Sequence, residues 1–115
     1  MSEPSITITV RTRFVGFHRW PGATGRRAYL ADRHRHLFHV EVSLATTHDD
    51  REVEFHDLLR EVELYGQGEE RGSASCEQMA RELGTDLRAM YPGRALAVSV
   101  FEDGEVGATL RWTED

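Results

Sequence analysis

The stretch HRHLFHVEVSL, residues 34–44, decides the fold of this chain. Its apolar side chains recur at every second position, which is the pattern of a strand with one buried face. The even-numbered face begins with His34 and His36 and continues with apolar residues, whereas the odd-numbered face carries His39 and Glu41. We therefore predict a strand whose core-facing side begins with two histidines.

A second alternating run lies upstream, at residues 6–18 (ITITVRTRFVGFH), and its even-numbered face ends in His18. Pro21, Gly22 and Gly25 mark the segment between the two runs as a loop. We expect the two strands to pair antiparallel through this loop. Such pairing brings His18 close to the first two histidines.

The periodicity changes downstream of Glu54. Apolar residues at helical spacing predict a short helix that ends before Gly66, and Ser75 with Gln78 forms a capping-box motif that opens a second helix. The apolar positions of the two helices are Phe55, Leu58, Leu59 and Val62, and then Met79, Leu83, Leu87 and Met90.

Alternating runs at 96–102 and 106–112 flank a favoured Asp-Gly hairpin turn. The order of elements predicts an α+β fold, in which a four-stranded antiparallel sheet has two helices inserted between its second and third strands.

The bulk composition sets the class of protein. A chain of 115 residues fits one domain, here 1–115, and the net charge of −6 argues against a nucleic-acid partner. No apolar run approaches the roughly 20 residues of a spanning helix, and the N-terminus lacks a signal-peptide pattern, so we expect a cytoplasmic protein without a membrane partner. Because Cys76 is the only cysteine, any metal site must use histidine and carboxylate.

His18, His34 and His36 are the candidate metal ligands. Three neutral imidazoles leave the fourth tetrahedral position of zinc open, as in catalytic sites, where the ion polarises a substrate oxygen. The alternative is that they are ordinary core or surface histidines. Glu102 is the last residue on the apolar face of the run 96–102. A carboxylate buried there would be costly without hydrogen-bond partners. It either accepts two N–H groups from a pterin or guanine edge, or reaches solvent at the strand end.

The motifs resemble the 6-pyruvoyl- and 6-carboxy-tetrahydropterin synthase family. The resemblance covers nearly the whole chain, in RFVGFHRWPG, HRHLFHVEV, VEFHDLLREV, SCEQMA and VSVFED. It implies the T-fold, zinc on His18, His34 and His36, and a substrate anchor at Glu102, with Glu77 of SCEQMA as a second substrate-binding candidate. It also implies a homo-oligomer, a trimer or a hexamer of paired trimers, with active sites between subunits.

The chain departs from the family's proton-transfer residues. The family's catalytic cysteine stands four residues before its His-x-His motif, where this chain has Leu30, and no Asp-His pair lies between Leu64 and Ser75. Cys76 and His56 are our catalytic candidates in place of these residues. His39 and a metal-bound water are further candidates for the base. A thiol at a helix N-terminus is more acidic than usual, which favours Cys76; the alternative is that Cys76 is a passive, half-buried residue.

The resemblance thus implies a zinc-dependent, lyase-like enzyme acting on a dihydropterin triphosphate or a related pterin or deazaguanine precursor, with altered proton-transfer residues. The alternative is a non-catalytic, zinc-containing module of the same fold that binds a pterin or purine-like small molecule. A cupin-type metal protein is a third reading, because Glu41 follows the His-x-His motif. It suits the chain less, since Glu41 lies on the opposite face of the strand from His34 and His36 and no second cupin motif is present.

Overall fold

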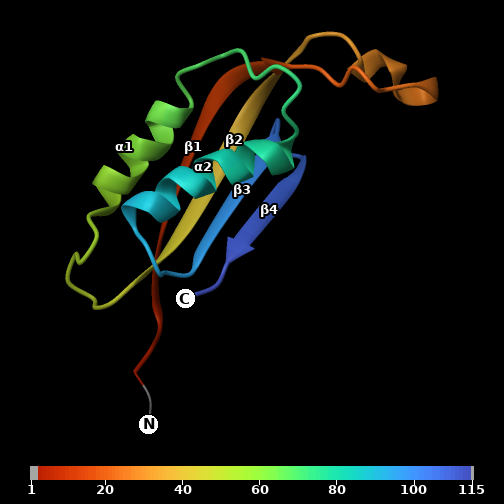
Figure 1. The fold of residues 1–115 in the computed structure, drawn as a ribbon. Helices are drawn as coiled ribbons and strands as arrows, with labels where there is room; N and C mark the ends of the chain where they lie inside the picture. The colour runs from red at the N-terminus through yellow and green to blue at the C-terminus, as the bar shows by residue number, and fades with distance from the viewer. Residues whose placement is uncertain (1–2, 115) are drawn as a thin grey trace.

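The computed structural model describes residues 3–114 and has four strands in one sheet. Strands β1 (Ile6–His18) and β2 (His34–Thr46) precede helices α1 (Phe55–Tyr65) and α2 (Cys76–Met90), and strands β3 (Leu96–Glu102) and β4 (Val106–Trp112) follow. All neighbouring strands pair antiparallel, in the order β1-β2-β3-β4 (Figure 1). This confirms the predicted α+β class and the insertion of both helices between β2 and β3.

Both helices cover the same face of the sheet, α1 against β1 and α2 against β3 and β4 (Figure 1). The alternation in sequence explains this arrangement, because the even-numbered side chains of β2 and β3 are the buried ones. Helix α2 begins as predicted, with a capping box in which Ser75 and Gln78 each accept a backbone N–H of the other. The fully buried side chains include Phe38, Leu44, Leu58, Met79, Leu83 and Leu87.

Two residues of the predicted apolar stripes lie outside the core. Phe55 is 50% exposed and Met90 is 47% exposed. They are the first residue of α1 and the last residue of α2, so helical periodicity alone could not show that the contact with the sheet stops short of them. None of the helices in residues 3–114 is long and apolar enough to cross a membrane.

The segment between β1 and β2 forms an arm that projects from the body of the molecule (Figure 1). The expected loop contains a short 3-10 helix, η1 (Gly25–Leu30), none of whose residues is buried. Gly25 opens it with a φ of 64°, a conformation that favours glycine.

The connection between α1 and α2 returns to the end of β1. The amide of Phe17 donates to the carbonyl of Glu69, Arg71 donates back to Phe17, and Arg19 donates to Gly72. These bonds occupy the outer edge of β1 next to His18. They hold the start of α2 beside the carboxyl end of β1, where the candidate site lies.

Candidate metal centre

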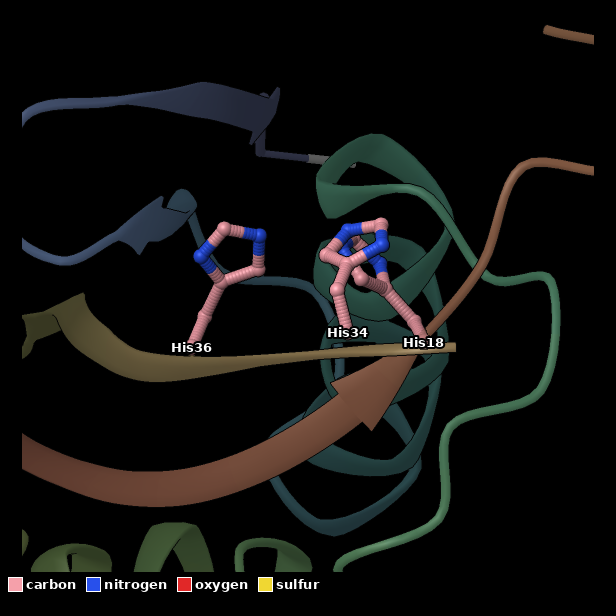
Figure 2. Close-up of side chains that lie close together, drawn as sticks. All are labelled: His18, His34 and His36. Carbon is pink, nitrogen blue, oxygen red and sulfur yellow. The ribbon is translucent and has the colours of Figure 1, made fainter. Parts of the chain in front are cut away.

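The three predicted histidines meet on the helix-covered face of β1 and β2. His18 is the direct cross-strand partner of His34, and His36 lies two residues further along β2. Their rings approach with centroid separations of 4.6 Å (His18–His34), 4.9 Å (His34–His36) and 5.2 Å (His18–His36). Figure 2 shows the three rings standing on the same side of the two strands. One nitrogen from each ring lies within 4.8 Å of the other two, so the group can hold a metal ion.

Each ring is oriented through its Nδ1 atom. The Nδ1 of His18 lies 2.8 Å from the carbonyl of Ala74, and that of His34 lies 2.8 Å from the carbonyl of Asp32. The Nδ1 of His36 lies 2.8 Å from the Oδ2 of Asp103. Because carbonyls and carboxylates only accept, Nδ1 carries a proton in each ring, and in the neutral imidazole Nε2 then keeps its lone pair. This outer arrangement is typical of histidines that bind metals through Nε2.

The Nε2 atoms of His18 and His36 are buried and have no hydrogen-bond partner in the described residues. A buried polar atom without a partner costs about 1–3 kcal/mol, and here two such atoms face the same space. A cation bound by these lone pairs would remove that cost. The imidazole donor set suits Zn²⁺, Cu²⁺, Fe²⁺ and Ni²⁺, so the site fits a divalent transition metal.

Glu102 lies against the same two imidazoles. Its Oε2 is 3.2 Å from the Nε2 of His18, and its Oε1 is 3.6 Å from the Nε2 of His36. Neither contact forms a hydrogen bond. The sequence placed Glu102 on the core-facing side of β3, and the structure adds that its carboxylate touches two of the three histidines.

Asp103 fixes both β2 and the His36 ring. Its Oδ1 accepts the amide of Leu37 at 2.9 Å while its Oδ2 accepts the His36 proton. The hydrogen bond from Leu37, and secondly the contact with His36, hold the pKa of Asp103 below its usual range. Asp103 adopts a φ of 56° in the turn before β4. The sequence identifies Asp103 only as a residue of the Asp-Gly turn, because its contact with His36 depends on the pairing of β2 with β3.

His18, His34 and Glu102 open onto a pocket of about 410 Å³. The lining also includes Arg19, Trp20 and Leu30 from the start and end of the arm, and Ala74 to Glu77 from the start of α2. Arg19 and Trp20 were not among the predicted site residues, because neither lies on a periodic face and their place depends on the path of the arm. A larger and more open hollow of about 840 Å³ over Tyr65 and Arg71 contains none of the three histidines.

The two catalytic candidates occupy different places. Cys76 lines the pocket but is only 7% exposed, and burial, with smaller effects of Glu102 and Glu77, raises the pKa of its thiol to about 12. The helix N-terminus therefore does not produce a thiolate at neutral pH. His56 is not part of the pocket lining, since its side chain is 77% exposed and its Nδ1 contacts Glu54 at 2.9 Å. Glu77 is exposed and lines the pocket.

Together, the fold and the site define an α+β protein with a three-histidine candidate metal centre at the wall of a pocket. No protein-family model matches the chain, and no curated protein matches it significantly.

Proposed function

We propose that this chain is a zinc-dependent, lyase-like enzyme of the 6-carboxy-tetrahydropterin synthase type, acting on a dihydropterin triphosphate or a related pterin or deazaguanine precursor. The observation that carries the proposal is the convergence of one nitrogen from each of three oriented histidines, two of which, His18 and His34, line the pocket. Zinc suits three imidazoles because it takes them in tetrahedral geometry and leaves one position open. Bound there, zinc supplies Lewis-acid polarisation of a substrate oxygen.

The pocket lining supports a planar, nitrogen-rich and anionic substrate. Trp20, which is 48% exposed, offers an aromatic surface for a heterocycle. Arg19 supplies a cation for a phosphate group, and the carboxylates of Glu77 and Glu102 can accept N–H groups from a 2-aminopyrimidinone edge. These groups bind and orient the substrate beside the histidines.

A second candidate function is a non-catalytic pterin- or purine-binding module. The observation that favours it is the pair Leu30 and Cys76, both in the pocket lining. Leu30 cannot transfer a proton, and the Cys76 thiol stays protonated because burial raises its pKa to about 12. In this alternative the metal and the acceptor groups hold a ligand without turning it over.

One experiment separates the two functions. We expect the purified protein to contain one zinc per chain by elemental analysis and to convert dihydroneopterin triphosphate, followed by chromatography of the pterin products. His34→Ala should lose both zinc and turnover, whereas His48→Ala, which alters an exposed turn histidine, should lose neither. Pterin binding without product would replace the enzyme by the binding module. Absence of zinc from the wild-type protein would contradict both.

The proposal extends to a homo-oligomer, a trimer or hexamer joined through sheet edges. β1 and β4 are the outer strands, and within residues 3–114 the outer edge of β1 is occupied only near Phe17. Open strand edges favour pairing with another chain, and Val106 at the start of β4 is 63% exposed. Sedimentation analysis should give a mass of three or six chains, and a monomer at micromolar concentration would exclude this assembly.

A further inference from the structure

Among the described residues, the carboxylate of Glu102 lies against two imidazole nitrogens and accepts no hydrogen bond. No N–H or O–H group of residues 3–114 donates a hydrogen bond to it, and its contacts are the Nε2 atoms of His18 and His36 at 3.2 and 3.6 Å. In the neutral imidazoles that bind metals, both Nε2 atoms are acceptors, because the single ring proton is used at Nδ1. Three acceptor groups therefore face one another without a donor between them.

These contacts are close to the separation expected for ligands of one ion. The ligand atoms that all lie within 4.8 Å of one another belong to the three histidines and not to Glu102, so the Glu102 side chain has to turn to complete the site. Zinc binds imidazole nitrogen and carboxylate oxygen at about 2.0–2.2 Å, so neighbouring ligand atoms of a tetrahedral site lie about 3.3–3.5 Å apart. The distance of 3.2 Å to His18 is slightly shorter than this range, and the distance of 3.6 Å to His36 is slightly longer. The side chain of Glu102 is 25% exposed, so it retains room to turn toward the histidines or toward the pocket.

We propose that Glu102 is the fourth ligand of the metal in the protein without substrate, so that the resting centre is a closed site of three nitrogens and one oxygen. This inference rests on the metal site of the proposed function. It differs from that proposal in the state without substrate, in which the fourth position of the metal is filled by Glu102. The carboxylate occupies the position that a substrate oxygen needs, so a substrate must displace Glu102 from the metal. Once displaced, Glu102 faces the pocket and is free to accept the N–H groups of the bound ring.

The test compares metal binding in three proteins that differ by single carboxylates. Glu102→Gln keeps the shape of the side chain and removes its charge. Glu77→Gln removes a charge from the lining of the same pocket, but among the described residues Glu77 forms no hydrogen bond or ion pair with the histidines, whereas Glu102 lies against two of them. Glu77→Gln therefore measures the long-range effect of losing one negative charge on metal affinity. Any further loss of affinity in Glu102→Gln measures direct binding of the Glu102 carboxylate to the metal.

Zinc affinity is measured by competition with a chromogenic chelator, and cobalt(II) is substituted to record the visible spectrum of the ligand field. Changes in outer partners of metal ligands alter affinity by about 10- to 100-fold, so loss of a direct ligand should lower the zinc affinity of Glu102→Gln at least about 10-fold relative to Glu77→Gln. The cobalt spectrum should shift in Glu102→Gln and match the wild type in Glu77→Gln.

The outcomes separate this inference from the function on which it rests. Equal zinc affinities and identical cobalt spectra in both variants and the wild type would overturn Glu102 as a ligand and leave the three-histidine site intact. A wild-type protein that binds neither metal would overturn the metal centre itself.

Discussion

At the scale of single residues, Asp103 decides which nitrogen of His36 can bind a metal. One carboxylate oxygen accepts the Leu37 amide and the other accepts the Nδ1 proton of His36. In Asp103→Asn the amide oxygen should remain on Leu37, because that N–H needs an acceptor, and the NH₂ group should then face Nδ1. Nδ1 becomes an acceptor, the proton moves to Nε2, and the ligand lone pair is lost.

Asp103→Asn should therefore lower zinc affinity by about 10- to 100-fold, as measured by chelator competition at neutral pH. Asparagine tolerates the positive φ of position 103, so the turn itself should persist. Asp32→Asn is the matched control, since Asp32 holds His34 through its backbone carbonyl. A similar loss of affinity in both variants would contradict the role of the Asp103 side chain.

Cys76 should behave as an inert thiol. Burial raises its pKa from 9.0 to about 12, and each pH unit of that shift lowers the thiolate fraction at neutral pH tenfold. Alkylation by iodoacetamide in the folded, metal-free protein should thus be on the order of 1,000-fold slower than in the urea-unfolded chain. Comparable rates in the two states would show that burial does not suppress the thiolate of Cys76, and would restore it as a candidate base.

At the scale of elements, the contact between α2 and β4 depends on a missing side chain. A Cβ atom at Gly84 would lie 2.1 Å from the indole of Trp112, so the helix can approach the strand only with glycine there. Gly84→Ala should lower the free energy of unfolding by about 1–3 kcal/mol through overpacking, although alanine favours a helix by about 1 kcal/mol.

Urea unfolding of Gly84→Ala and of Thr85→Ala tests this contact. Thr85 is the exposed neighbour of Gly84 on α2, so its replacement reports helix propensity without the clash. We expect Thr85→Ala to be neutral or slightly stabilising. A stabilised Gly84→Ala would mean that the helix does not pack this closely on Trp112.

The elements were largely predictable from the sequence because each has a clear period. The two histidines of β2 and His18 on β1 share the parity of the buried residues, so their convergence followed once the strands were expected to pair antiparallel. The ends of the helices were less predictable, as the exposed Phe55 and Met90 show. Helical periodicity does not record where the neighbouring sheet stops.

The outer contacts of the site could not be predicted in the same way. The carbonyls of Asp32 and Ala74 hold two of the rings, and backbone atoms leave no signal in residue types. The contact of Glu102 with His18 depends on the side-chain conformation and on the stagger between β2 and β3. Its position on the strand was predictable, whereas its distance from the histidines required coordinates.

At the scale of the whole molecule, metal binding should appear as stability. A ligand that binds only the folded state stabilises it by about 2.7 kcal/mol at 100 times its Kd, which for a chain of this size raises Tm by roughly 10 °C. Thermal unfolding with zinc should show this rise, and EDTA should reverse it. His34→Ala should abolish the rise, whereas His48→Ala, in an exposed turn, should keep it.

The same stabilisation should depend on pH in a defined direction. Imidazoles bind metal only when neutral, so protons compete with zinc, and the rise in Tm should be full at neutral and alkaline pH and disappear in acid. Thermal scans with and without zinc across this range measure the difference directly. A rise in Tm that persists in acid, or that survives His34→Ala, would place the stabilising ion on surface carboxylates instead of on the three histidines.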